Sequence, residues 1–226
     1  MNPLLACKTA RRSLRDTFKR YLLRRYVRTW SDIFEDLILD SYFHRSDGFY
    51  IDIGANDPVN LSNTYRFYRK GWRGIAIEPN PHLHAKALKK RPRDINLNVG
   101  IAPEETKLRF YEAKIHATSS FLPDRVPQDK LVRTIDVPCY RLSTIIEKYA
   151  PNEQIDFMTV DTEGMDLEVL KTFPWDKKRP TIVLVETGEN KKPILEAMQS
   201  WGYTFYYYSG VNSFFMEKDH FSAFSG

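Results

Sequence analysis

A short polar run, Asp52 to Asp57, follows an apolar stretch and has the composition of a ligand-binding turn. Gly54 permits a tight turn and lets a ligand approach the backbone closely. A turn that seats a pyrophosphate on a helix N-terminus needs the spacing G-x-G-x-x-G. Here only Gly54 is present, and Ala55, Asn56 and Asp57 follow it. The run therefore predicts a ligand without a pyrophosphate.

Glu78 ends the next apolar stretch, where an acid in an α/β protein accepts hydrogen bonds from both hydroxyls of a ribose. The alternative is that Glu78-Pro79-Asn80-Pro81 only starts a helix, with Asn80 as its N-cap and Pro81 in its first turn. Both roles are compatible. S-adenosylmethionine (SAM) combines a ribose with an amino-acid end and a cationic sulfonium, which suit Asp, Asn and backbone amides. The two segments together predict SAM as the cofactor.

Three further acids are expected at the same edge of the sheet. Asp161 and Glu163 follow the fourth predicted strand and Glu186 ends the fifth. We assign Asp161 to the SAM amino group or to the acceptor, and Glu163 or Glu186 to the acceptor hydroxyl as general base. Glu163 has an alternative role as a helix-entry acid. An Mg²⁺ ion between Asp161 and Glu186 is another interpretation, but no dense ligand motif accompanies it, so no metal site is predicted.

Two other segments hold candidate site residues. His116 lies in a polar insertion and is a candidate base, because histidine titrates near neutral pH; a lone loop histidine is otherwise simply exposed. Ser62, Asn63 and Thr64 either cap the following helix or reach the methionine end of SAM.

Short β-rich runs alternate with helical stretches from Phe49 onward, which indicates βαβ units and a mainly parallel sheet. Strands are predicted at 49–53, 74–78, 95–99, 155–160 and 181–186, and helices at 61–70, 81–90, 143–149, 164–172 and 191–201. An insertion at 103–140 holds two further β-like runs, 108–111 and 135–137, and is expected to contact substrate.

Two final β runs, 203–208 and 212–217, predict an antiparallel hairpin. The fold class expected is α/β: a Rossmann-like class I methyltransferase fold, with a mainly parallel central sheet closed by this hairpin and an N-terminal helical extension. We divide the chain into a basic amphipathic extension, residues 1–47, and a SAM-dependent methyltransferase domain, residues 48–226.

Residues 1–30 hold nine of the lysines and arginines against one acid, and apolar residues recur there every three or four positions. This pattern predicts a basic amphipathic helix, which either binds anionic lipid, packs on the domain or contacts RNA. The rest of the chain is mildly acidic, so nucleic-acid binding is not expected. No apolar run has the length of a membrane span or a signal peptide, so the protein is expected in the cytoplasm, peripheral at the inner face of the membrane if the helix binds lipid. Cys7 and Cys139 form no disulfide or metal pattern.

Several motifs together resemble the FkbM-type methyltransferases: Asp52-Ile-Gly-Ala-Asn56, Ile77-Glu-Pro-Asn80, Asn98-Val99-Gly100, and Ile155 to Gly164 with Leu167-Glu-Val-Leu170. The resemblance covers about residues 48–217. It implies SAM contacts from these motifs, including Pro79, Asn80, Asn98, Val99 and Gly100. It also implies methyl transfer to a hydroxyl, often on a sugar of a glycan or a glycosylated natural product. Asp57-Pro58, where a further glycine often follows, and Asp166, where Glu is common, depart from the family pattern.

The leading hypothesis is O-methylation of a sugar in a cell-surface glycan or glycolipid precursor, as a step of polysaccharide biosynthesis. Two alternatives stay open: an O-methyltransferase of a small secondary metabolite, and a non-catalytic SAM- or nucleotide-binding module that acts through its basic helix. The sequence does not predict the oligomeric state.

Overall fold

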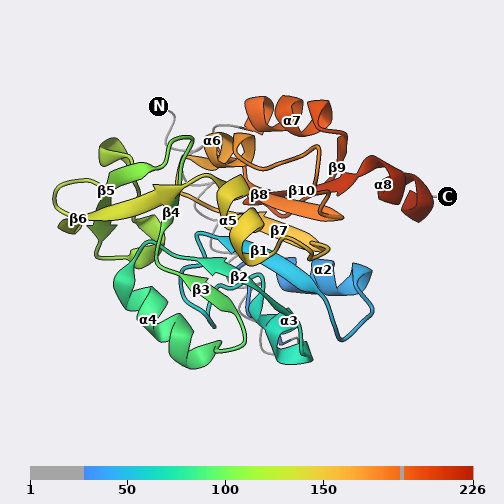
Figure 1. Cartoon of the computed structure of the whole chain (residues 1–226), viewed down its shortest axis with the longest axis horizontal. Coiled ribbons are helices and arrows are strands. Elements are labelled where there is room, and N and C mark those ends of the chain that lie inside the picture. Colours follow the sequence, from blue (N-terminus) through green and yellow to red (C-terminus); the bar gives the residue numbers. More distant parts are fainter. Residues whose placement is uncertain (1–27, 189–190, 226) are drawn as a thin grey trace, which may run out of the picture.

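The first core strand, β1 (Phe49–Ile53), is buried along its whole length, as expected for a central strand of a parallel sheet that is covered on both faces. Phe49 and Ile51 belong to the apolar cluster on one face of the sheet, and Tyr50 belongs to the cluster on the other face. The computed structural model, which describes residues 28–188 and 191–225, is therefore a three-layer α/β sandwich (Figure 1).

The central sheet has seven strands. In spatial order they are β3 (Ile95–Leu97), β2 (Arg73–Ile77), β1, β7 (Phe157–Val160), β8 (Ile182–Glu186), β10 (Asn212–Glu217) and β9 (Tyr203–Tyr208). Neighbours from β3 to β8 are parallel, whereas β10 runs antiparallel to both β8 and β9. A parallel sheet closed by an antiparallel hairpin confirms the expected class I methyltransferase architecture.

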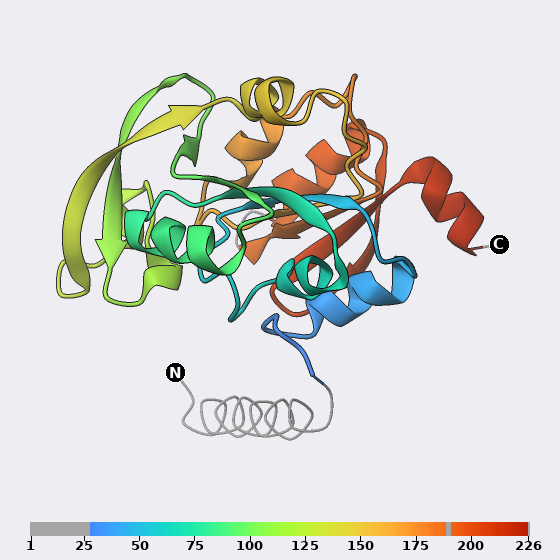
Figure 2. The same cartoon turned by 60° about the horizontal axis from the view of Figure 1, so that its bottom comes forward.

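Helices cover both faces of this sheet (Figure 2). The cluster on one face contains side chains of α5 (Leu142–Tyr149), α6 (Asp166–Lys171) and α7 (Lys191–Ser200). The cluster on the other face contains side chains of α2 (Glu35–Tyr42) and α3 (Tyr65–Lys70). Two more helices are α4 (Pro81–Lys90), beside β3, and the C-terminal α8 (Lys218–Ser225). Within the described ranges no helix combines the length and apolar character needed to cross a membrane.

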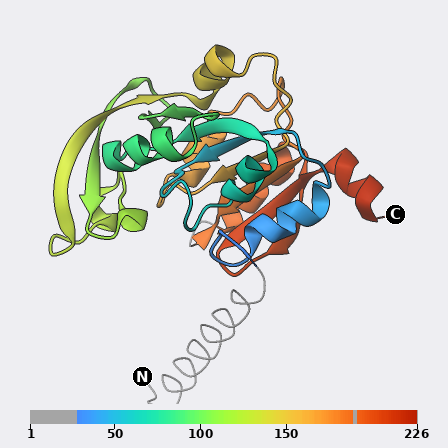
Figure 3. The same ribbon diagram turned by 90° about the horizontal axis from the view of Figure 1, so that it is seen from below.

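The predicted insertion forms an arm beside the sandwich (Figure 3). It contributes β5 (Thr106–Ala113) and β6 (Leu131–Tyr140) to a second sheet, which also contains the preceding β4 (Gly100–Ile101) and has the order β4-β6-β5. Two 3₁₀ turns, η1 (His116–Thr118) and η2 (Pro123–Arg125), connect β5 to β6. Both extra strands are longer than expected, because β5 and β6 pair with each other along most of their length.

Four predicted elements are at least two residues shorter in the structure, and one of them, the strand expected from residue 155, begins at Phe157. The helix expected from residue 61 begins at Tyr65, because Leu61 has a left-handed φ of 56°. The helix expected from residue 164 begins at Asp166, because Glu163 and Gly164 have φ values of 53° and 112°. The strand expected to reach residue 99 ends at Leu97, since Gly100 pairs with Cys139 in the second sheet.

The predicted N-terminal helix lies mostly outside the described residues. Part of the proposed extension packs on the domain. The side chains of Leu39 in α2 and of Phe43 directly after it belong to the same apolar cluster as Tyr50 of β1. The division of the chain between residues 47 and 48 stays a prediction. The sequence patterns indicated neither α2 nor α8.

Candidate active site

A cavity of about 240 Å³ lies at the carboxyl ends of β1, β2, β7 and β8, the edge at which α/β proteins bind ligands. Most of the predicted site residues line it. These are Asp52, Gly54, Ala55, Asn56, Ser62, Asn63, Glu78, Pro79, Val99, Gly100, His116, Asp161, Glu163 and Glu186. Parallel strands bring their polar ends together here, so segments more than a hundred residues apart in the chain form one site.

The turn after β1 is joined by hydrogen bonds to both neighbouring strands. The backbone N–H groups of Gly54 and Ala55 donate to the carbonyl of Ile77 at 3.0 and 3.1 Å, and the N–H of Asp161 donates to the carbonyl of Ile53 at 3.0 Å. Gly54 has a φ of 76°, and a Cβ there would lie 1.7 Å from the carbonyl oxygen of Asp161. The turn therefore requires glycine both for its conformation and for the close approach of β7.

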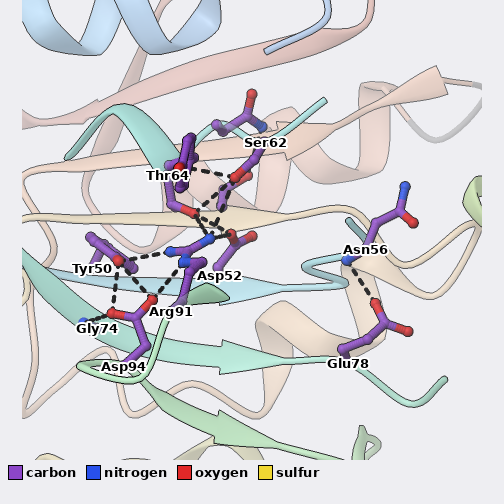
Figure 4. A network of polar contacts seen from close by, with 12 residues as sticks. Tyr50, Asp52, Asn56, Ser62, Thr64, Gly74, Glu78, Arg91 and Asp94 are labelled. Atoms are coloured by element: carbon purple, nitrogen blue, oxygen red, sulfur yellow. Dashed lines mark hydrogen bonds and ion pairs between the residues drawn. The ribbon is translucent and has the colours of Figure 1, made fainter. Parts of the chain in front are cut away.

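Glu78 is buried at the end of β2, and both of its carboxylate oxygens accept backbone hydrogen bonds. Oε2 accepts from the N–H of Asn56 at 2.7 Å (Figure 4), and Oε1 accepts from the N–H of Asn80 at 2.8 Å. Burial raises the pKa of Glu78 from 4.5 to about 7, against the lowering effect of these two donors. A carboxylate oxygen can accept more than one hydrogen bond, and Glu78 lines the cavity, so its carboxylate can still accept from a ligand.

Four predicted cofactor contacts do not line the cavity. Asp57 forms an ion pair with Lys86 and accepts from the N–H of Asn60 at 2.9 Å. Asn80 caps α4, as the alternative interpretation predicted, by accepting from the N–H groups of His82 and Leu83 at 2.9 and 3.3 Å. The remaining two are Thr64, which donates to Asp52, and Asn98, which donates to the carbonyls of Glu78 and Pro79. Thr64, Asn80 and Asn98 each form a hydrogen bond with a residue that lines the cavity, whereas the partners of Asp57 lie outside it.

Asp161, Glu163 and Glu186 form a carboxylate cluster in the cavity, with one oxygen of each within 4.8 Å of the others. Burial and then the negative charges of Glu186, Glu163 and Asp166 raise the pKa of Asp161 well above its ordinary value. Burial and the charge of Glu186 likewise raise the pKa of Glu163 to about 7. The cluster therefore favours a proton, a cation or hydrogen-bond donors between its oxygens.

The backbone of Glu163 has an unfavourable conformation in this cluster. Its φ of 53° is left-handed, which is uncommon for a residue with a side chain. The carboxylate of Asp166 accepts from the N–H of Thr162 at 2.8 Å, and the hydroxyl of Ser120 donates to the carbonyl of Glu163 at 3.0 Å. Such strain is concentrated at functional sites, where the surrounding structure determines the conformation.

The insertion closes one side of the cavity with Ser119, Phe121 and the η1 residues His116 and Ala117. The Nδ1 atom of His116 lies 3.7 Å from the Glu112 carboxylate and 3.4 Å from the Asn80 amide. Both of these polar contacts are with residues outside the carboxylate cluster. Substrate contact by the insertion stays a prediction, as does catalysis by His116.

Ser62 supports the capping alternative, whereas Asn63 does not, and both residues line the cavity. The Ser62 hydroxyl accepts from the N–H of Tyr65 in the first turn of α3 at 3.1 Å. The Asn63 amide donates to the hydroxyl of Thr159 on β7 at 3.2 Å.

Beneath Asp52 lies a buried network that the sequence did not indicate (Figure 4). The guanidinium of Arg91, which is fully buried, donates to Asp94 at 2.7 Å, to the Tyr50 hydroxyl at 2.7 Å and to the Thr64 hydroxyl at 2.9 Å. It lies 3.8 Å from the carboxylate of Asp52. The network places a positive charge beneath the cavity floor. Its residues come from three separate segments, and no local spacing in the sequence links the three.

Asn212 lines the cavity, although the sequence did not indicate it as a site residue. It lies on β10 directly opposite Glu186 on β8. The side chain is buried, and its amide Nδ2 donates to Glu35 of α2 at 3.1 Å.

Comparisons with known proteins give the following matches. The model of the methyltransferase FkbM domain matches residues 52–205. A TehB-like SAM-dependent methyltransferase from Corynebacterium glutamicum superposes with a TM-score of 0.43 at 10% identity, covering 90% of this chain and 97% of that chain. A precorrin-6y C5,15-methyltransferase from Geobacter metallireducens superposes with a TM-score of 0.40 at 15% identity, covering 76% and 71%. No curated protein sequence matches.

Proposed function

Because this chain belongs to the FkbM methyltransferase domain family, we propose that it transfers the methyl group of SAM to a hydroxyl oxygen of a sugar, in a glycan or glycolipid precursor. The family makes SAM the cofactor. SAM supplies an electrophilic methyl group on a cationic sulfur. The observation that carries the hydroxyl assignment is the carboxylate cluster of Asp161, Glu163 and Glu186, which lines the same cavity as the residues assigned to SAM.

The residues at the ends of β1 and β2 fit SAM in their donor and acceptor chemistry. The Glu78 carboxylate has lone pairs left for the two hydroxyls of a ribose. Asn56 and Asn63 place amide groups on the cavity wall, where an amino-acid end needs both donors and acceptors. The pyrophosphate-binding glycines are absent, so the turn at Gly54 suits this cofactor better than a dinucleotide.

A neutral hydroxyl is a weak nucleophile at neutral pH, so its methylation needs alignment and a proton acceptor. The bond between the acceptor oxygen and the methyl carbon forms as the sulfur–methyl bond breaks, and that bonding electron pair goes to sulfur. The hydroxyl proton goes to a carboxylate of the cluster, for which Glu163 and Glu186 are the candidates. Asp161 faces the SAM amino group or the acceptor.

A labelling experiment tests the acceptor class. The full chain is incubated with methyl-labelled SAM and, separately, with cell-envelope glycans, free sugars and apolar phenols. The proposal expects label on a glycan and a mass gain of one methylene unit on an isolated sugar residue. Label on phenols alone would support the small-metabolite alternative, whereas SAM binding without any transfer would support a non-catalytic module.

SAM affinity is expected to decrease as the pH falls below about 7. The raised pKa of Glu78 means that its carboxyl takes up a proton in this range, and a ribose hydroxyl donates better to the ionised form. SAM binds the form of the protein in which Glu78 is ionised. Its affinity is therefore highest above pH 7 and decreases by up to about tenfold per pH unit between pH 7 and 4.5. Calorimetric titration with SAM at several pH values measures this.

The control is Glu78→Gln, which cannot titrate. Its SAM affinity should be lower than that of the natural chain at pH 8 and should lose the component of the pH profile that Glu78 supplies. The neighbouring acids Asp52 and the carboxylate cluster remain in both proteins, so they cancel in the comparison. Identical profiles in the two proteins would refute the assignment of Glu78 to the ribose.

We further propose that the basic N-terminal segment brings the enzyme to a membrane-bound acceptor at the inner face of the membrane. The charge and the apolar periodicity of this segment support the proposal. Both come from the sequence, since residues 1–27 lie outside the described part of the chain. Deleting residues 1–27 should abolish co-sedimentation with anionic vesicles and leave turnover of a soluble acceptor fragment intact. Unchanged co-sedimentation would refute the proposal.

A further inference from the structure

The cavity contains buried side-chain oxygens that have no hydrogen-bond partner. Among the described residues, three buried side-chain oxygens have no hydrogen-bond partner, and two of them, Asp161 Oδ1 and Asn212 Oδ1, belong to residues that line this cavity. Unpaired buried oxygens are rare in proteins, because each one loses its hydrogen bonds to water. Two unpaired oxygens in one cavity, beside the carboxylates of Glu163 and Glu186, indicate that the cavity binds a ligand that accepts electron pairs, such as a cation.

Asn212 is an independent observation, because it is a neutral residue on a different strand from the acids. Only 6% of it is exposed, and it faces Glu186 across the antiparallel β8–β10 pair, so both side chains lie on the same face of the sheet. The Glu35 carboxylate accepts from Asn212 Nδ2 at 3.1 Å, and a carboxylate cannot donate. This contact fixes the amide orientation and leaves Oδ1 for a ligand in the cavity.

We propose that Asp161, Glu186 and Asn212 Oδ1 bind a divalent cation of the Mg²⁺ or Mn²⁺ class. Three neighbouring strands, β7, β8 and β10, supply these ligands, and all the ligand atoms are oxygens, the preference of hard cations. The cation would offset the repulsion between the carboxylates. Glu163 lies beside this site, within 4.8 Å of both other carboxylates.

The use of the cation rests on the proposed function, although its binding does not. A cation at this position would hold the hydroxyl oxygen of the acceptor and lower its pKa, while Glu163 takes the proton. It would also favour an acceptor with two neighbouring hydroxyls, such as a sugar, since both oxygens can coordinate one ion. The proposal thereby adds a reason for a sugar acceptor that does not come from the family.

Mn²⁺ titration of the full chain, freed of metal with EDTA and without SAM, tests the site. Electron paramagnetic resonance follows the free ion. We expect one Mn²⁺ per chain, displaced by Mg²⁺. Asp161→Asn and Glu186→Gln should each weaken binding at least about tenfold. Glu168→Gln is the matched control, because Glu168 is an acid of the nearby helix α6 that pairs with Lys171 outside the cavity.

Thermal unfolding of the same proteins excludes misfolding as the cause. Asp161→Asn should keep or raise the metal-free midpoint, since it removes a repelling charge, and should lose the increase in midpoint that Mn²⁺ gives the natural chain. No Mn²⁺ binding by the natural chain, or equal binding by Asp161→Asn, overturns the proposal. SAM binding, measured on the same samples, distinguishes failure of the cation site from failure of the proposed function. SAM binding without Mn²⁺ binding would refute only the cation site. Mn²⁺ binding without SAM binding would refute only the proposed function.

Discussion

Replacing Glu163 by glutamine is expected to slow methyl transfer by a factor of about 10²–10⁴, the usual contribution of a positioned base. The amide has nearly the same shape as the carboxylate but cannot accept the hydroxyl proton. Glu163 is the member of the carboxylate cluster that is held by a left-handed backbone and by the hydrogen bond from Ser120. Its replacement should therefore change the rate more than the structure.

The measurement is single-turnover transfer to the best acceptor found in the labelling experiment, together with SAM affinity. A base predicts a large decrease in kcat with SAM affinity unchanged within a few-fold. Loss of affinity with an unchanged single-turnover rate would instead assign Glu163 to the cofactor. If Glu186→Gln removes the rate and Glu163→Gln does not, Glu163 is not the base.

Ser120→Ala supplies a related but smaller effect. The hydroxyl of Ser120 contacts the Glu163 carbonyl and no reacting group, so it acts as a positioning residue. Its loss should lower the rate much less than Glu163→Gln does, and Ser120→Thr should restore part of that loss. Equal effects of Ser120→Ala and Glu163→Gln would indicate that the loop conformation, and not the carboxylate, determines the rate.

The sequence predicted the strand ends well, because in a parallel sheet local patterns determine them. Each of β1, β2, β7 and β8 is a short apolar run followed directly by polar residues or glycine. Since all four strands run in the same direction, their ends must meet at one edge. Gly54, Glu78, Asp161 and Glu186 could therefore be assigned to one site without a structure.

What could not be predicted depends on contacts between distant segments. Asn212 follows a Gly-containing connection in the last hairpin, and only the antiparallel pairing of β10 with β8 brings it opposite Glu186. Thr64 and Asn98 were candidates for SAM contact, yet neither lines the cavity, and they form hydrogen bonds with Asp52 and with the carbonyl of Glu78 instead. Adjacency in a motif does not tell which side chain faces the ligand and which supports its neighbour.

The supporting network gives the largest expected effect on stability. Arg91→Met should lower the free energy of unfolding by about 3–5 kcal/mol, because it leaves the buried carboxylate of Asp94 without its cation. Burial already raises the pKa of Asp94 and of Asp52, and in both residues Arg91 opposes this shift. For a chain of this length the unfolding midpoint should fall by about 6–20 °C.

Thermal and denaturant unfolding measure this effect, with Lys89→Met as the control, since Lys89 is exposed in the last turn of α4. Adding Asp94→Asn to Arg91→Met should recover part of the loss, because it removes the charge that lost its partner. The Arg91→Met penalty should also shrink at lower pH, where Asp94 takes up a proton. If the penalty is below about 1 kcal/mol, or if Asp94→Asn adds to it fully, the ion pair does not support the fold. Because Asp52 of the cavity floor lies 3.8 Å from the same guanidinium, a real penalty should be accompanied by weaker SAM binding, which connects this buried charge to the cofactor site.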